Sequence, residues 1–203
     1  DIYSEQDFFN AFYSVLGQWD SHHYYVIAQK GYISDYLAAW FPLYPVLIKS
    51  LTLLHIDIRL AASLISNISL FICLIYFYNL VSMLYSGKTA LYTLLLFSFS
   101  PLTFFYSIPY TESLFLMFTV MSCYYILDKK WLAASIFAAL SSATRNSGEF
   151  IAIPMIFMFY DLYIRNRNLN IKVLFGDFFR HLFPYLVITA SGVIIFMVHL
   201  YFC

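Results

Sequence analysis

Three separate stretches of the chain carry polar side chains whose types and spacing suit acid–base and anion-binding chemistry. The first, W-D-S-H-H-Y-Y-V-I-A-Q-K-G-Y, occupies residues 19–32. Helical spacing places Asp20, Tyr24 and Ile27 on one face, and Gly31, one turn further along, suits a helix end. A carboxylate beside a tryptophan, at a helix start near a membrane interface, is placed for partial desolvation and for work as a general base. The alternative is that Asp20 caps the helix or is a solvated loop charge.

The other two stretches add a second carboxylate and a guanidinium. In residues 109–113, Thr111 can cap the helix that follows, and Glu112 suits the positive end of that helix. The functional alternative is that Glu112 accepts a hydrogen bond from a sugar hydroxyl or pairs with Arg145. In residues 143–148, Arg145 lies at a helix end, where an arginine in a membrane must be paired or must snorkel to water. Its planar fork also suits a phosphate bidentately.

Neighbouring residues are expected to position a substrate. His22 and His23 are adjacent and point in different directions on a helix, whereas metal-binding pairs favour a spacing of four residues. They are interpreted as interfacial polar residues, with the alternative that His23 hydrogen-bonds Asp20 or a substrate. Residues 41–45 read F-P-L-Y-P, whose prolines bend or start a helix and shape a cavity wall. The candidate substrate-binding residues are Trp19, His23, Tyr24, Tyr110, Glu112 and Asn146, and no metal site is predicted.

Composition indicates that membrane helices position these stretches. The chain has 203 residues, of which 62% are hydrophobic and 11% charged, whereas a soluble domain carries about 25% charged residues. A formal net charge of +0 gives no basic footprint for nucleic acid. The three cysteines form no C-x-x-C pair, so neither a disulfide framework nor a zinc site is indicated.

Six apolar runs approach, with their flanks, the roughly 20 residues that a spanning helix needs. They occupy residues 60–84, 89–108, 113–127, 131–144, 150–164 and 182–202. We therefore predict an all-α transmembrane helix bundle forming one domain over residues 1–203. Its parts are an outer loop with an interfacial helix over 1–40 and about six spanning helices over 60–203. The start at Asp1 and the end inside an apolar run lead us to expect a fragment of a longer membrane protein.

Charge decides the topology around residues 41–56, which are apolar but contain two prolines and Lys49. If this segment is re-entrant or peripheral, the basic positions of the later turns share one side, which the positive-inside rule makes cytoplasmic. These positions are Lys88, Lys129, Lys130, Arg165, Arg167, Lys172 and Arg180. Asp20, Glu112 and Arg145 then share the opposite, non-cytoplasmic face. We predict this arrangement, in which the three side chains meet in one pocket.

Four motifs, in this order, resemble the family of GPI mannosyltransferase II and its prokaryotic relatives. They are W-D-x-x-x-Y-x-x-I-A-x-x-G-Y at 19–32, F-P-L-Y-P at 41–45, Y-T-E-S-L-F at 110–115 and T-R-x-x-G at 144–148. The resemblance covers residues 18–161 and implies a GT-C type, inverting glycosyltransferase without a nucleotide-sugar site. It also implies an essential acidic residue in the first outer loop, which maps onto Asp20. The sequence departs from the family pattern at two places: Gln18 replaces a basic residue of the eukaryotic members, and the 41–56 region is compact. These differences leave the identity of the acceptor open.

The resemblance implies transfer of mannose, or a related hexose, from a polyprenyl- or dolichyl-phosphate sugar to a glycolipid or glycan acceptor. Asp20 would accept the proton of the acceptor hydroxyl, and Arg145 would stabilise the leaving phosphate. No cofactor is expected. The partners are the lipid-linked donor, the acceptor and the bilayer, without nucleic acid. The protein is expected in the endoplasmic reticulum membrane of a eukaryote or the plasma membrane of a prokaryote.

Two other classes of function compete with this interpretation. A transporter or flippase for a lipid or small solute would place ionisable residues near mid-membrane and show a polar path through the bundle. A non-catalytic subunit of a membrane complex would leave the outer carboxylates without a substrate. An enzyme, by contrast, predicts that Asp20 and Arg145 open onto one outer cavity.

Overall fold

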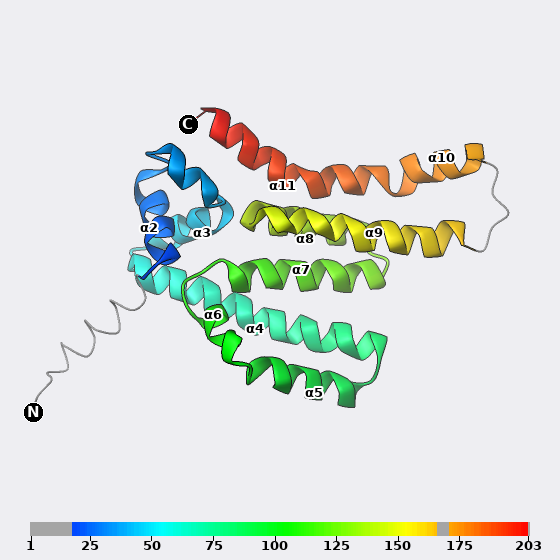
Figure 1. The fold of residues 1–203 in the computed structure, drawn as a ribbon, viewed down its shortest axis with the longest axis horizontal. Coiled ribbons are helices and arrows are strands. Elements are labelled where there is room, and N and C mark those ends of the chain that lie inside the picture. Colours follow the sequence, from blue (N-terminus) through cyan, green and yellow to red (C-terminus); the bar gives the residue numbers. More distant parts are fainter. Residues whose placement is uncertain (1–17, 166–170, 203) are drawn as a thin grey trace, which may run out of the picture.

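The computed structural model describes residues 18–165 and 171–202, and over these residues it contains helices and no strands (Figure 1). The helices are α2 (Asp20–Lys30), α3 (Leu43–Thr52), α4 (Ile58–Leu84), α5 (Gly87–Ser98), α6 (Phe104–Ser107), α7 (Glu112–Leu127), α8 (Trp131–Thr144), α9 (Ala152–Phe159), α10 (Ile171–His181) and α11 (Phe183–Phe202). The prediction of an all-α fold is confirmed for this part of the chain. Neighbours in the bundle are α5 and α4, then α4 and α7, α7 and α8, and α8 and α11.

Helix α4 is the long central element of the bundle, and it matches the expected run at 60–84. It begins where the Asp57 side chain accepts hydrogen bonds from the backbone N–H groups of Arg59, at 2.9 Å, and Leu60, at 3.2 Å. This N-cap satisfies donors that have no partner inside the helix. With 27 residues and a mean hydropathy of 2.1, α4 is roughly 40 Å long and can cross a bilayer.

The expected run at 89–108 is wrong as a single helix. Helix α5 ends at Ser98, a tight turn at Pro101–Thr103 leads into α6, and the helical piece Pro101–Ser107 is bent by 69° relative to α5. Pro101 has no N–H group to continue a helix, and the preceding Ser100 is held in an extended conformation with ψ of 137°, as the proline ring requires.

The remaining expected runs correspond to shorter or interrupted helices. Helices α7 and α8 have 16 and 14 residues. The run at 150–164 is divided among a tight turn over Asn146–Ile151, α9 and a π-helical segment over Tyr160–Ile164. By length and composition, one described helix can cross a membrane, or two if the bent pair forms one span. The start of the expected outer loop, residues 1–17, and Arg167 lie outside the described residues.

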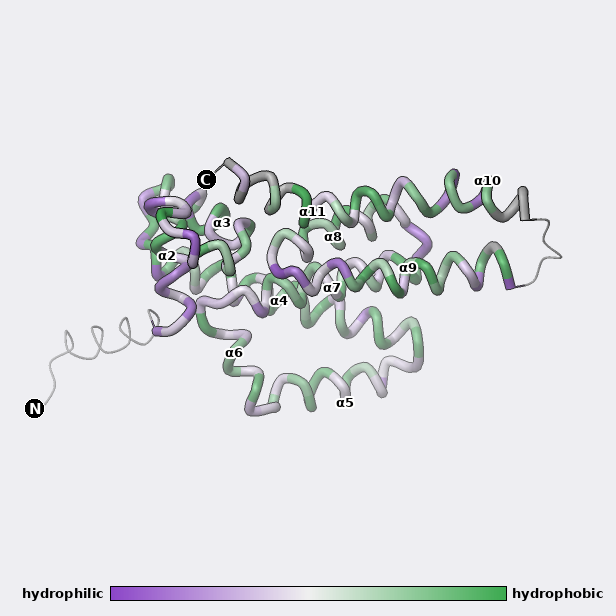
Figure 2. Tube along the Cα trace, turned by 45° about the horizontal axis from the view of Figure 1, so that its top comes forward, coloured by the Kyte–Doolittle hydropathy of each residue, from purple (hydrophilic) through white to green (hydrophobic). Residues whose placement is uncertain are grey.

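Small side chains bring α7, α8 and α11 close together. Ala134, Ala138 and Ser142 of α8 are fully buried. Gly192 of α11 lies so near α8 that a Cβ built on it would be 2.1 Å from the carbonyl oxygen of Ala139. Close approach through small residues is typical of helix packing in membranes. Figure 2 shows mainly apolar positions along α4 and α5, and hydrophilic positions gathered over α2.

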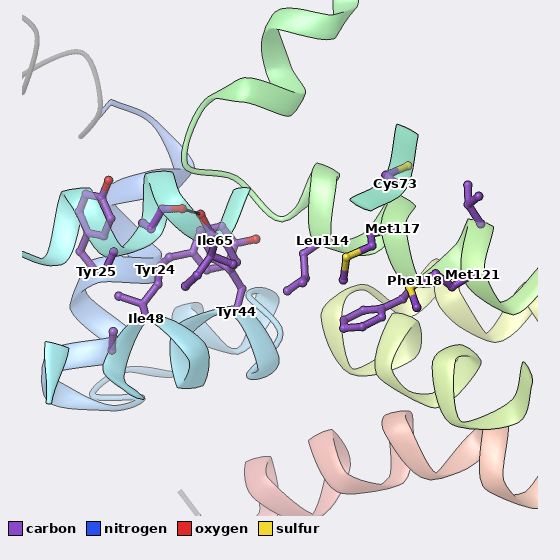
Figure 3. Close-up of a cluster of buried hydrophobic side chains, with 14 residues drawn as sticks. Tyr24, Tyr25, Tyr44, Ile48, Ile65, Cys73, Leu114, Met117, Phe118 and Met121 are labelled. Atoms are coloured by element: carbon purple, nitrogen blue, oxygen red, sulfur yellow. Dashed lines mark hydrogen bonds between the residues drawn. The ribbon is translucent and has the colours of Figure 1, made fainter. Parts of the chain in front are cut away.

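Tyrosine side chains dock α2 and α3 onto the start of α4 (Figure 3). The buried Tyr44 hydroxyl donates to the carbonyl of Ala62 at 3.0 Å and is hydrogen-bonded to the Ser66 hydroxyl at 2.8 Å. Ser66 in turn donates to the carbonyl of Tyr110 at 3.0 Å. These bonds connect α3, α4 and the turn before α7, so the polar stretch at 109–113 is held next to α3 and the start of α4.

Candidate active site

Helix α2 carries the first candidate residue at its start. Trp19 occupies the N-cap position with a positive φ of 50° and makes no side-chain cap hydrogen bond. Asp20 is therefore the first residue of the helix, and the alternative that it is the N-cap is wrong. Asp20 is exposed, and the side chain of Trp19 is 71% exposed. Since both residues are exposed, the expected burial of Asp20 beside Trp19 is not found. Gly31 ends α2 with a positive φ of 76°, as expected.

A polar cavity of about 280 Å³ brings distant segments together at this end of the bundle. Its lining residues are Asp20, Tyr24, Ala39, Trp40, Phe41, Thr144, Arg145 and Asn146. They come from α2, from the segment that leads into α3, and from the end of α8 with the residues after it. Asp20 and Arg145 thus open onto one cavity, as the enzyme hypothesis requires.

Arg145 is held by a carboxylate and a hydroxyl from the start of α7. Its Nη1 donates to Oε1 of Glu112 at 2.5 Å and lies 3.5 Å from Oγ1 of Thr111. The helix ends here because Arg145 adopts an extended conformation, with φ of −153° and ψ of 144°. Of the two readings of Arg145, paired or simply snorkelling, the structure shows the paired one, and Glu112 is its partner. A guanidinium group with one nitrogen held by a carboxylate keeps its other N–H groups in a fixed orientation, which suits the binding of an anion in the cavity.

Thr111 has a different role from the expected helix cap. Its backbone is already helical, with φ of −77° and ψ of −13°, and its side chain makes no cap hydrogen bond. The Thr111 hydroxyl is instead hydrogen-bonded to the hydroxyl of Tyr24 at 3.2 Å. A cap residue needs a non-helical backbone to aim its side chain at the following N–H groups, and Thr111 lacks it.

Two hydroxyl groups of α2 fix this helix to the turn before α7. Ser21 donates to the carbonyl of Pro109 at 3.0 Å, and Tyr24 is hydrogen-bonded to Thr111. Burial raises the pKa of Tyr24 to about 12, since removal from water disfavours the phenolate. The Tyr24 hydroxyl therefore stays protonated near neutral pH and remains a hydrogen-bond donor in the wall of the cavity.

Four of the candidate residues do not line this cavity. Glu112 acts through Arg145 instead. Tyr110 is buried, and burial, followed by the negative charge of Asp20, raises its pKa. Trp19 points outward. His23 is hydrogen-bonded to the Tyr36 hydroxyl and packs against Trp40, with ring centroids 4.2 Å apart. The expected bond from His23 to Asp20 is thus replaced by contacts with two aromatic rings.

Trp40 and Thr144, which had no predicted site role, also line the cavity, and so does Phe41 of the segment 41–45 that was expected to shape a cavity wall. Phe41 and Thr144 stand inside the motifs F-P-L-Y-P and T-R-x-x-G, so motif membership was a usable signal. Trp40 directly precedes the first of these motifs. Its position was uninformative because no periodic pattern runs through the non-helical segment that carries it.

A larger cavity of about 830 Å³ opens at the other end of the bundle. Apart from Asp161 and Arg165, which form an ion pair at 2.9 Å, its lining is mostly apolar and comes from α4, α7 and the α9 region. Over the described part of the chain, no group of three or more His, Cys, Asp or Glu side chains lies together in a way that could hold a metal ion. The charged cavity at the α2 end is therefore the candidate active site.

Comparisons with known proteins point to a glycosyltransferase. A family model described as Mannosyltransferase (PIG-V) matches residues 4–202. GPI mannosyltransferase 2 of Schizosaccharomyces pombe is 26% identical over 154 residues, which cover 74% of this chain and 33% of that protein. The chain thus spans about a third of the length of this curated relative. No solved structure matches the chain.

Proposed function

This chain belongs to the Mannosyltransferase (PIG-V) family, and we propose that it transfers mannose from a polyprenyl- or dolichyl-phosphate donor to a glycolipid or glycan acceptor. The observation that carries the proposal is the shared cavity of Asp20 and Arg145. The name of the fission-yeast relative favours a glycolipid of the GPI type as the acceptor.

The proposal includes a membrane-embedded GT-C type bundle with the cavity on the non-cytoplasmic side. Large apolar side chains that the chain itself leaves uncovered support a bilayer around it: Leu96 is 78% and Phe99 84% exposed, and contiguous apolar surface of this kind is costly in water. The cavity lies at the α2 end, while the turns with Lys88, Lys129 and Lys130 lie at the other end (Figure 1). Basic turns favour the cytoplasmic side.

The mechanism follows from the two charges on the walls of the cavity. The carboxylate of Asp20 takes the proton of an acceptor hydroxyl while that oxygen attacks the anomeric carbon of the donor sugar. The bond between the anomeric carbon and the phosphate oxygen breaks, and the electron pair leaves with the lipid phosphate. Arg145 stabilises the developing charge, a contribution of several kcal/mol where water is excluded. Glu112 and Thr111 keep the guanidinium in place.

The substitution Asp20→Asn tests this function. We expect purified full-length protein carrying it to lose mannose transfer from labelled polyprenyl-phosphate mannose by roughly 10²- to 10⁴-fold, because the amide cannot accept the proton. Asp35→Asn is the matched control, since Asp35 is exposed and does not line the cavity. A wild-type rate in Asp20→Asn at normal expression would remove Asp20 from the mechanism. Failure of the wild-type protein with every lipid-linked hexose donor would overturn the proposed reaction.

A further inference from the structure

Three aromatic side chains pack against one another beside the candidate active site. The ring centroid of Trp40 lies 4.2 Å from that of His23 and 5.3 Å from that of Tyr36. The Tyr36 hydroxyl is hydrogen-bonded to the His23 ring, and Tyr36 is 57% exposed. We call Trp40, His23 and Tyr36 the aromatic platform. It is a group of packed rings at the edge of a charged cavity, because Trp40 also lines that cavity.

The backbone fixes Trp40 in place. Its N–H donates to the carbonyl of Leu37 at 3.0 Å, and its own carbonyl accepts a hydrogen bond from the Tyr32 hydroxyl at 2.6 Å. Trp40 also lines the cavity together with Asp20 and Arg145. An aromatic residue that only anchors a protein in the membrane interface faces lipid head groups. The place of Trp40 in a wall shared with two charged side chains indicates a ligand-binding role instead.

The lining residues come from two different parts of the chain. Asp20, Tyr24 and Trp40 belong to the N-terminal segments, whereas Thr144, Arg145 and Asn146 belong to the end of α8 and the turn after it. In a displacement at the anomeric carbon, the nucleophile and the leaving group occupy opposite sides of that carbon. In the proposed reaction, Asp20 therefore marks the acceptor side and Arg145 the donor side, and Trp40 comes from the same N-terminal part of the chain as Asp20.

We propose that the aromatic platform binds the acceptor sugar, a hexose whose apolar C–H face stacks on the indole of Trp40. This inference rests on the proposed function for the choice between acceptor and donor. A hexose has one face rich in C–H groups, which gains from burial against an aromatic ring, and hydroxyl groups at its rim. Because Trp40 and Asp20 line the same cavity, we expect a rim hydroxyl of the stacked hexose to face the carboxylate of Asp20. His23 and Tyr36 are positioning residues that pack against the indole and hold its plane.

Sugar binding is measured first, without any transfer reaction. The probe is methyl α-mannopyranoside with full-length protein in detergent, observed by saturation-transfer-difference NMR. We expect the wild-type signal to fall by more than half in Trp40→Leu, which keeps apolar volume against the core but removes the flat ring, and to persist in Trp40→Phe. Tyr85→Ala is the control, because Tyr85 is an exposed aromatic residue that directly follows α4 and does not line the cavity; the connection from α4 to α5 lies at the end of the bundle opposite α2 (Figure 1). An undiminished signal in Trp40→Leu would overturn the platform.

Kinetics then separates the acceptor from the donor. With polyprenyl-phosphate mannose as donor, we expect Trp40→Leu to raise the KM of the acceptor about tenfold, a loss in the range of a stacking contact, and to leave the donor KM unchanged. Tyr36→Ala should give a smaller rise in the same KM, and it removes only an exposed side chain if Trp40→Leu folds poorly. A rise in the donor KM alone would overturn the acceptor assignment. Mannoside binding that depends on Trp40 in a protein that transfers no mannose would support the platform and reject the proposed function.

Discussion

Arg145 and Glu112 are separated by 33 residues along the chain and joined by one short contact between Nη1 and Oε1. The contact matters because Glu112 fixes the orientation of the planar guanidinium, which then presents its remaining N–H groups to an anion. A lysine ammonium on a flexible side chain has no such fixed orientation. The chemistry of this position therefore depends on the shape of the cation as well as on its charge.

The substitution Arg145→Lys should consequently be severe although it keeps the charge. We expect mannose transfer to fall about 10- to 100-fold, because lysine cannot hold Glu112 and a phosphate at once with planar geometry. The measurement is the dependence of transfer rate on the polyprenyl-phosphate mannose concentration. Arg165→Lys at the far end of the bundle is the control. An unchanged donor response would mean that Arg145 has no contact with the donor phosphate.

Thr111 offers a second test at the residue scale, because its buried hydroxyl is shared by Tyr24 and Arg145. Thr111→Val keeps the volume and removes the hydroxyl, so the buried Tyr24 hydroxyl loses its partner at a cost of about 1–3 kcal/mol. We expect a lower thermal midpoint and a higher donor KM in Thr111→Val. Thr111→Ser should restore both quantities. Equal donor KM values in the two variants would show that Thr111 supports the fold but not Arg145.

Residue types predicted part of the lining of the candidate site and did not predict Trp40. Asp20 and Arg145 were identifiable because a carboxylate and a guanidinium at membrane-helix ends are costly without a purpose. Trp19 and Tyr110, which were predicted to bind substrate, do not line the cavity, since proximity in sequence to a charged residue does not fix the direction of a side chain. Trp40 was missed for the same reason, because its direction depends on the tertiary docking of α2 and α3.

At the scale of elements, the turn after α8 determines where Arg145 lies. Gly148 in this turn is packed so tightly that a Cβ would be 2.3 Å from the backbone nitrogen of Ser142 and 2.4 Å from the carbonyl carbon of Ser141. Both atoms belong to the backbone of α8, so no side-chain rotation can make room. The glycine thus allows the chain to fold back against the helix that ends at Arg145.

Gly148→Ala should therefore reduce transfer strongly by moving the turn that carries Arg145. We expect a lower thermal midpoint as well, since overpacking costs about 1–3 kcal/mol. Gly176→Ala is the matched control, because a Cβ there meets nothing within 4 Å and alanine favours helix. Normal activity and stability in Gly148→Ala would contradict the close packing of this turn.

The hydrophobic runs in the sequence predicted where the helices lie more accurately than where the helices are interrupted. The run at 60–84 was recognisable because it is long, apolar and closed by polar turns. The run at 89–108 was read by its apolar length alone, although Pro101 and the extended Ser100 before it forbid a continuous helix there. The break after Thr144 was expected from the N-S-G turn. The π-helical segment at Tyr160–Ile164 has no signal in the sequence that we can identify.

For the molecule as a whole, the two ends of the bundle differ in chemistry. The end around α2 has the polar cavity and the aromatic platform. The other end has the basic turns, where α4 leads into α5 and α7 leads into α8 (Figure 1), and the larger apolar cavity is lined by the last residues of α4 and α7 together with α9. The sequence predicted that distant turns would share one end, because the parity of helix crossings leaves few arrangements that also collect the basic residues on one side. It did not predict the tyrosine hydrogen bonds that dock α2 and α3, since these depend on tertiary packing.

The orientation of the whole molecule gives the last prediction. In a cysteine-free background, Glu149→Cys marks the cavity end and Lys88→Cys marks the opposite end; both positions are exposed. In sealed vesicles with the non-cytoplasmic face outward, a membrane-impermeant maleimide should label Glu149→Cys and should label Lys88→Cys only after detergent is added. The reason is that the basic end is retained on the cytoplasmic side. The reverse pattern would place the cavity in the cytoplasm, and labelling of both positions in intact vesicles would contradict a bundle that spans the bilayer between them.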